Sequence, residues 1–307
     1  MLRFLLRRLI VAIPTLLAVV TLAFFMMRAA PGGPFDSDRR LPPSVMANIE
    51  ARFGLDQPLP VQFARYLGDV VQGDFGPSLK YQDKSVIQIV REGFPVSLRI
   101  GLGALTVGMV LGVLLGVVAA LRQNRPADYA ATAIAVLGVC IPTFVTAPLL
   151  ILYFGKTLNW FPSGGWNEGA LSNMVLPVAV LALPQIAVIS RLTRAGMVEV
   201  LRSNYVRTAR AKGLPEHRIV IRHALRAALL PLVSYLGPAC AGIITGSLII
   251  EDIFGLPGLG KSFVTGALQR DYTVVMGVVI LYAGLIVTLN LIADLLVAAL
   301  DPRVRLS

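Results

Sequence analysis

One stretch of the chain has the spacing of a phosphate-binding loop. Residues Gly255 to Ser262 read Gly-Leu-Pro-Gly-Leu-Gly-Lys-Ser, which fits the pattern G-x-x-x-x-G-K-[ST]. In a true P-loop a β-strand leads into the loop and a helix follows, so that backbone N–H groups surround the phosphates. Here the preceding segment, Ala227–Ile250, is a long apolar run, and no alternating β–α pattern surrounds the motif. We therefore interpret the match as a chance one and expect a Gly/Pro-rich turn between two helices.

The other residue types that support catalysis or metal binding form no recognisable site. His217 and His223 lie six positions apart on a basic segment and lack the i, i+4 pairing of a helical zinc site. Cys140 and Cys240 lie inside apolar runs and indicate neither a disulfide framework nor a cysteine metal site. Asp294, near the end of an apolar run, suits an interhelical hydrogen bond or snorkelling better than a proton relay. We predict no catalytic residue, no metal site and no cofactor bound by this chain.

The composition is that of a membrane protein. Hydrophobic residues make up 56% of the 307 residues and charged residues 15%, and the mean hydropathy is +0.73. Soluble domains are nearer a quarter charged, so an ordinary cytosolic enzyme is excluded. Six runs without Asp, Glu, Lys or Arg would form helices of about 28–40 Å, enough to cross a hydrocarbon core of about 30 Å. These runs are Leu9–Met27, Ile100–Leu121, Tyr129–Gly155, Gly169–Ser190, Ala227–Ile250 and Tyr272–Ala293.

The predicted fold is therefore all-α and integral to the membrane, with six transmembrane helices. A cleaved signal peptide is the alternative for the first run, because Arg3, Arg7 and Arg8 precede it. Its apolar core is longer than the usual ~7–15 residues, and Arg28 lies where a cleavage site needs small residues, so we expect a retained helix. Prolines mark candidate kinks in the middle runs. They are Pro142, Pro148, Pro177, Pro184, Pro231 and Pro238.

The excess positive charge lies on one side of the predicted bundle. The N-terminus, residues 121–128 and 191–226 and the C-terminal tail carry 16 Lys and Arg against four acidic residues. The segments 28–99, 156–168 and 251–271 carry 12 basic and 12 acidic residues. By the positive-inside rule the first set is cytoplasmic, and so are both termini. This topology explains the net charge of +11 without a nucleic-acid partner.

The long segment between the first and second runs is predicted to be extracytoplasmic and to contain three short helices. We expect them over Ser44–Phe53, Pro60–Val71 and Ser85–Glu92, the last ending at Gly93. Helices this short cannot bury a core alone, so the segment is either a structural cap on the bundle or a docking face for an external partner. We expect residues 1–95 to form an N-terminal part and residues 96–307 a five-helix core.

The cytoplasmic loop, residues 191–226, is the most informative segment. It divides into two helical pieces around Gly213-Leu214-Pro215, where Gly213 can end one helix and Pro215 suits the start of the next. Short helices rich in small residues and flanked by cations make a poor enzyme site and a reasonable docking surface. The alternative is an ordinary positively charged loop that contacts lipid headgroups.

The same loop carries a family resemblance. Tyr205-Val-Arg-Thr-Ala-Arg-Ala-Lys-Gly-Leu-Pro, Arg222-His-Ala-Leu225 and Leu229-Leu-Pro231 resemble the cytoplasmic loop of binding-protein-dependent ABC importer permeases of the dipeptide/oligopeptide/nickel branch. The general motif, E-A-A-x-x-x-G-x(9)-I-x-L-P, is kept at Ala209, Gly213 and Leu225. It is not kept at Arg207, Thr208, His223 and Arg226. Stretches along the rest of the chain, including Gly73-Asp-Phe-Gly76 and Arg270-Asp-Tyr272, also resemble this family. Within the branch, the chain is most similar to the first permease subunit of oligopeptide importers.

The resemblance implies a fold of the type I ABC importer permease kind, in the bacterial cytoplasmic (inner) membrane, and a role in peptide import. It implies three kinds of protein partner: a second homologous permease subunit, two cytoplasmic ATPase subunits that bind ATP and Mg, and an extracytoplasmic substrate-binding protein. It also implies that the loop couples ATP hydrolysis to transport, with Ala209 against the ATPase. The implied coupling residues are Tyr205, Arg207, Thr208, Ala209, Arg210, Ala211, Lys212, Gly213 and Leu214.

Two other functions stay open on the sequence. A secondary transporter is the competing class, although Asp294 alone is a candidate for ion coupling and no internal repeat stands out. An ABC permease for another solute, such as nickel or glutathione, is the alternative within the same class. The sequence names no residue that contacts the transported solute.

Overall fold

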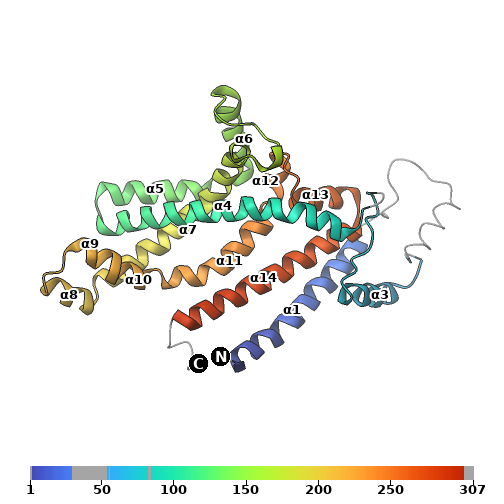
Figure 1. Cartoon of the computed structure of the whole chain (residues 1–307), viewed down its shortest axis with the longest axis horizontal. Helices are drawn as coiled ribbons and strands as arrows, with labels where there is room; N and C mark the ends of the chain where they lie inside the picture. Colours follow the sequence, from blue (N-terminus) through green and yellow to red (C-terminus); the bar gives the residue numbers. More distant parts are fainter. Residues whose placement is uncertain (1, 30–53, 55, 82–83, 301–307) are drawn as a thin grey trace. The chain divides into compact units, whose positions relative to one another are not determined.

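The computed structural model describes residues 2–29, 54, 56–81 and 84–300, and this part of the chain is almost entirely helical (Figure 1). Its one β-bridge joins Pro77 to Ser85. The principal helices are α1 (Leu2–Ala29), α3 (Leu59–Val71), α4 (Val86–Leu121), α5 (Pro126–Cys140), α6 (Thr143–Leu150), α7 (Leu171–Leu201), α11 (Leu230–Gly246), α12 (Leu248–Ile253), α13 (Leu259–Gln269) and α14 (Tyr272–Leu300). The loop between α7 and α11 contains α8 (Asn204–Ala211), α9 (Glu216–Arg218), the π-helix η3 (Ile219–Ala224) and α10 (Leu225–Ala228). A second π-helix, η1 (Ile151–Thr157), and the 3₁₀ turn η2 (Asn167–Gly169) separate α6 from α7.

Five segments of the described chain are long and apolar enough to cross a membrane, and the third predicted run is the exception. These five are Ile10–Ala29, Val86–Leu121, Leu171–Leu201, Leu230–Ile253 and Tyr272–Leu296. The third run is not one straight helix, because Pro126–Cys140 and Thr143–Thr157 meet at an angle of 101°. Ile141 before Pro142 is extended, with φ −92° and ψ 117°, as the steric demand of a following proline requires. The count of six spans therefore stays a prediction that depends on how this bent pair crosses the membrane.

The helices predicted before the second run have different outcomes. The Pro60–Val71 helix is confirmed as α3, and Ser44–Phe53 lies outside the described residues. The prediction that a short helix ends at Gly93 is wrong, because α4 continues through Gly93 and Pro95 to Leu121. A Cβ on Gly93 would lie 2.9 Å from the backbone N of Leu259, so this glycine permits a close approach to α13 and does not end a helix.

The chain divides into two compact units. The first contains Met1–Val96 and Pro257–Leu285, and the second contains Ser97–Leu256 and Ile286–Ser307. The boundary near residue 96 lies close to the predicted division at 95, but the first unit also takes in α13 and the first half of α14.

In the second unit α4 packs closely against α7 along three glycines four residues apart. A Cβ on Gly108, Gly112 or Gly116 would lie 2.6–2.8 Å from atoms of α7, which is closer than real Cβ contacts allow. The two helix backbones therefore approach each other directly. α5 also packs against α7, and Asp128 near the start of α5 forms a two-pronged ion pair with Arg194, with N–O distances of 2.7 Å.

In the first unit α1 and α3 share a small aromatic core. Phe24 is fully buried and packs against Phe63 and Tyr66, with ring centroids 5.1 and 5.9 Å apart. The chain after α3 is held by Asp271, whose buried carboxylate accepts hydrogen bonds from the hydroxyls of Ser78 and Thr273 and from the backbone N–H of Val274. Asp271 thereby acts as the N-cap of α14.

Candidate functional site

The predicted coupling loop folds into a compact structure at one end of the second unit. Figure 1 shows α8, α9 and α10 grouped there, after the end of α7. The predicted break into two helical pieces is confirmed: α8 ends at Ala211, and α9 begins at Glu216 after Pro215, which occupies the N-cap position. The loop therefore presents a formed helix, α8, rather than an irregular chain.

The inner face of α8 is buried against the rest of the loop. Val206 and Ile219 are fully buried, Ala209 is nearly so, and the three pack together with Val200 and Leu214. The expectation that Ala209 faces a partner protein is wrong, because its methyl group belongs to the loop's own core. The small side chain is needed there since a larger one would separate α8 from η3.

The turn after α8 depends on Gly213. Its φ is +74°, in the left-handed region that a glycine at a helix end commonly adopts, and a Cβ would meet nothing within 4 Å. The N–H of Gly213 donates to Arg210 O at 2.9 Å and the N–H of Leu214 donates to Ala209 O at 3.3 Å. These two bonds, together with the Leu214–Ala209 contact, form a Schellman motif. Gly213 is thus required for its backbone conformation and not for lack of space.

The outer face of α8 is exposed and cationic. Tyr205, Arg207, Thr208, Ala211 and Lys212 are all exposed. Arg210 differs from the other cations because its guanidinium donates to the Glu216 carboxylate at 2.6 Å across the turn. This hydrogen bond lowers the pKa of Glu216 and raises that of Arg210. Within the described chain no carboxylate forms an ion pair with Arg207 or Lys212, so the outer face offers these two charges to a partner.

The second half of the loop is fixed to the helical bundle. Val220, Ala224 and Ala228 are buried against Ala120 at the end of α4 and Met197 of α7. A Cβ on Gly196 would lie 2.5 Å from Ala228 O, so α10 lies directly on the α7 backbone. Continuous packing therefore links α8 through η3 and α10 to α7.

The P-loop-like stretch leads into a helix, α13, as a phosphate loop does, but it differs from a phosphate loop in other respects. It follows a helix, α12, and not a β-strand. The N–H groups of Gly255 and Leu256 already donate to Asp252 O at 3.0 Å and Glu251 O at 2.8 Å, so they are not free to bind a phosphate. The side chains of Leu256 and Leu259 are fully buried. The expected turn between two helices is confirmed.

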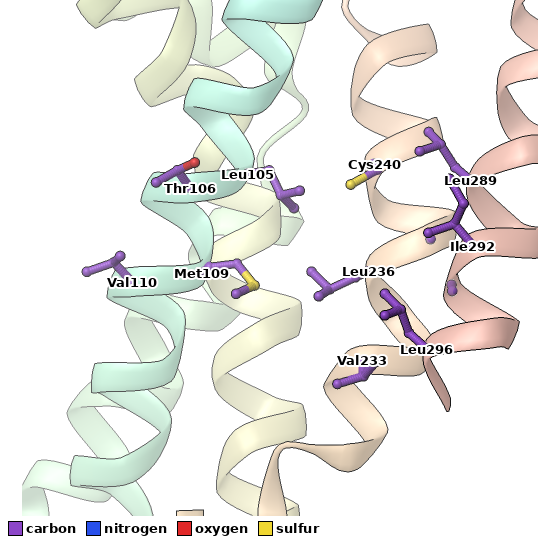
Figure 2. Close-up of a pocket in the computed structure, with 12 residues that line it drawn as sticks. Leu105, Thr106, Met109, Val110, Val233, Leu236, Cys240, Leu289, Ile292 and Leu296 are labelled. Carbon is purple, nitrogen blue, oxygen red and sulfur yellow. The ribbon is translucent and has the colours of Figure 1, made fainter. Parts of the chain in front are cut away.

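An apolar groove of about 390 Å³ lies in the second unit between α4, α11 and α14 (Figure 2). Figure 2 shows Met109 and Leu236 facing each other across it. The lining contains no charged residue, and the hydroxyl of Thr106 donates to Leu102 O at 2.8 Å. The groove suits a lipid chain or an apolar helix face and cannot pair with the charged ends of a peptide.

Two structural carboxylates were not predicted from the sequence. Asp271 precedes a long apolar run, which is the position of an N-cap, so its role could have been inferred. The partner of Asp128, Arg194, lies 66 residues away, and no local pattern indicates that pairing. Within the described residues no group of three His, Cys, Asp or Glu is placed to hold a metal ion.

Comparison with known proteins decides the family. Residues 112–306 match the family described as binding-protein-dependent transport system inner membrane component, and residues 1–101 match its N-terminal counterpart. The chain belongs to this family. It is 54% identical over 305 residues to the oligopeptide transport system permease protein OppB of Escherichia coli (strain K12), covering 99% of this chain and 100% of that one. It is 44% identical to the dipeptide transport system permease protein DppB of Bacillus subtilis (strain 168), covering 100% and 99% of the two chains.

Solved structures agree on the fold. An inward-facing structure of the MetNI methionine ABC transporter matches with a TM-score of 0.59 at 19% identity, covering 70% of this chain and 97% of that one. An amino acid ABC transporter matches with a TM-score of 0.52 at 18% identity, covering 71% and 94%. The predicted family and the predicted all-α permease fold are confirmed, while the six-helix count and the extracytoplasmic segment stay predictions. The prediction of a non-catalytic membrane subunit is confirmed as well, since the family is the membrane component of its transport systems.

Proposed function

We propose that this chain is a permease subunit of an ATP-driven importer that moves oligopeptides across the bacterial cytoplasmic membrane. The observation that carries the proposal is the 54% identity to an oligopeptide transport system permease over nearly the whole of both chains. The apolar helices supply the membrane-spanning part, and the compact loop after α7 supplies a place for a cytoplasmic partner.

The partners follow from the same assignment. A second permease subunit of similar fold completes the translocation path, and an extracytoplasmic binding protein delivers the peptide. Two cytoplasmic ATPase subunits bind ATP and Mg, which this chain does not. Both termini and the loop 191–226 are cytoplasmic in this arrangement, as the distribution of Lys and Arg favours.

The coupling step is assigned to α8. Its inner face is committed to the loop core, so only the outer face, with Tyr205, Arg207, Thr208 and Lys212, can enter a groove of the ATPase. Because η3 and α10 are packed on α7, a displacement of α8 by nucleotide-driven closure of the ATPases moves the end of α7 with it. Charge complementarity then predicts acidic residues in the ATPase groove.

The experiment is reconstitution of the permease pair and ATPases in proteoliposomes with external binding protein. We expect uptake of radiolabelled tri- to pentapeptides that requires ATP inside and binding protein outside. The double variant Arg207→Glu/Lys212→Glu should lose ATPase copurification, while Arg122→Glu, an exposed cation outside the loop, should not. Peptide uptake driven by a proton gradient without the ATPases would establish a secondary transporter instead.

A further inference from the structure

The first unit contains a polar cavity of about 320 Å³, at the lower end of the range for small-molecule sites (~300–1,000 Å³). Its walls are the end of α1, Gly54 and Gln57 before α3, one face of α3 that includes Arg65, the chain from Asp74 to Leu79 and the start of α14. The cavity lies in the segment that we propose to be extracytoplasmic. It differs from the apolar groove because cations, carboxylates and aromatic rings all line it.

One part of the cavity is suited to an anion. Arg28 donates from Nε to Gln62 Oε1 at 2.9 Å and its guanidinium carbon lies 3.6 Å from the centroid of the Phe24 ring. The described residues provide no carboxylate within ion-pair distance of this half-buried cation. Beside it the hydroxyl of Tyr66 is buried without a hydrogen-bond partner in the described chain, and burial raises its pKa, so it keeps its proton. A carboxylate entering here would meet a fixed guanidinium and an unused O–H donor.

Another part of the same cavity is suited to a cation. Asp69 lies one helical turn beyond Tyr66 on α3. Asp74 lies just after the end of α3, and its Oδ1 accepts a hydrogen bond from the N–H of Gly76 at 2.8 Å. The Asp69 carboxylate forms no ion pair within the described chain. Phe75 and Tyr272 add aromatic surface between these charged groups.

We propose that this cavity binds a short zwitterionic peptide, with the free carboxylate on Arg28 and Tyr66 and the free amino group on Asp69 and Asp74. The inference rests on the proposed function for its ligand class, because a peptide importer meets such molecules on this side. Two arginines and two aspartates line this one cavity, and charges of both signs match the two ends of a di- or tripeptide. The cavity would hold a peptide at the extracytoplasmic surface of the permease, outside the membrane-spanning path.

The test uses the complete permease–ATPase complex in nanodiscs, without binding protein or nucleotide. Calorimetric titration with L-alanyl-L-alanine should give saturable binding, and N-acetyl-alanyl-alanine amide, which lacks both charges, should not bind. Tyr66→Phe removes only an unpartnered hydroxyl and should weaken binding at least about tenfold, as should Asp69→Asn. The matched controls Tyr81→Phe and Asp56→Asn, at residues that do not line the cavity, should stay within about twofold.

Each other outcome overturns the inference. Absent binding, equal binding of the capped dipeptide, or unchanged affinity in Tyr66→Phe and Asp69→Asn would show that the cavity does not recognise a zwitterion. Weaker docking of the binding protein in these variants, without dipeptide binding, would show that the cavity contacts that protein instead. ATP-dependent uptake with binding protein is measured in parallel. Uptake without dipeptide binding removes this inference alone, and dipeptide binding without uptake removes the proposed function alone.

Discussion

Substitutions at Gly213 test whether the turn after α8 depends on the backbone conformation of this glycine or on the absence of a side chain there. The glycine has φ +74°, and a Cβ added there would meet nothing within 4 Å, so any cost of substitution is a backbone cost. A β-branched residue held at positive φ costs about 1–3 kcal/mol. Asn adopts this conformation far more readily than other non-glycine residues. We therefore expect Gly213→Val to open the turn and Gly213→Asn to preserve it.

The magnitude follows from the two hydrogen bonds of the turn, which keep α8 against its buried neighbours. If all of ~1–3 kcal/mol appears as lost population of the docked α8, the apparent affinity for the ATPase falls about 5- to 150-fold. Membrane insertion should be normal because the apolar helices are unchanged. The assay is copurification of the ATPase subunits followed by peptide uptake in proteoliposomes.

Two results would refute this reasoning. Wild-type coupling in Gly213→Val would show that the turn does not set the position of α8 or that α8 does not carry coupling. An equal defect in Gly213→Asn and Gly213→Val would place the problem in the added side chain, against a partner surface, and not in the backbone.

Three further predictions test the loop and the rejected P-loop. Ala209→Glu should destabilise the loop by about 2 kcal/mol or more, because it buries a charge. The control Ala211→Glu, on the exposed face of α8, should leave the melting temperature of the complex unchanged. Equal melting temperatures for the two variants would contradict the burial of Ala209. Lys261→Ala should leave ATP hydrolysis within about twofold, and loss of hydrolysis in an intact complex would reinstate the nucleotide site. The exposed pair Glu216–Arg210 should stabilise the fold by less than about 1 kcal/mol. Because the folded-state pKa of Glu216 is lowered, this stabilisation should be constant above the ordinary pKa of 4.5 and should disappear as the pH falls through the lowered pKa. The melting temperature of Glu216→Gln should therefore differ from wild type at pH 7 and converge with it in acid, and a gap that widens in acid would contradict the pairing.

The parts of the fold that were predicted correctly are those that short-range sequence controls. Five of the six uncharged runs form single helices that are long and apolar enough to cross a membrane, and Gly213 before Leu214-Pro215 specifies a helix end and a positive φ. The family resemblance in the same loop then supplied the function class. Each of these signals is contained within about 30 residues.

The parts that were missed depend on distant neighbours. Gly93 reads as a helix terminator, and only the backbone of Leu259, far along the chain, shows that it permits close packing. Ala209 reads as a contact for a partner until Ile219 is seen to cover it. The Asp128–Arg194 pair and the charged cavity likewise bring together residues that no spacing rule connects.

Because Ala209 is buried, the family-motif residues Ala209 and Gly213 are expected to shape the loop itself and not to contact the ATPase. A small residue at 209 and a glycine at 213 build the inside of the loop, where Val206 and Ile219 are fully buried. The exposed residues, Arg207 and Lys212, are free to differ with the partner, because nothing in the described loop fixes their side chains. Under the proposed coupling role, mechanical transmission through η3 and α10 would require the buried set, and recognition of a particular ATPase would require the exposed set. Exchange of the exposed residues alone should then redirect partner choice without loss of coupling.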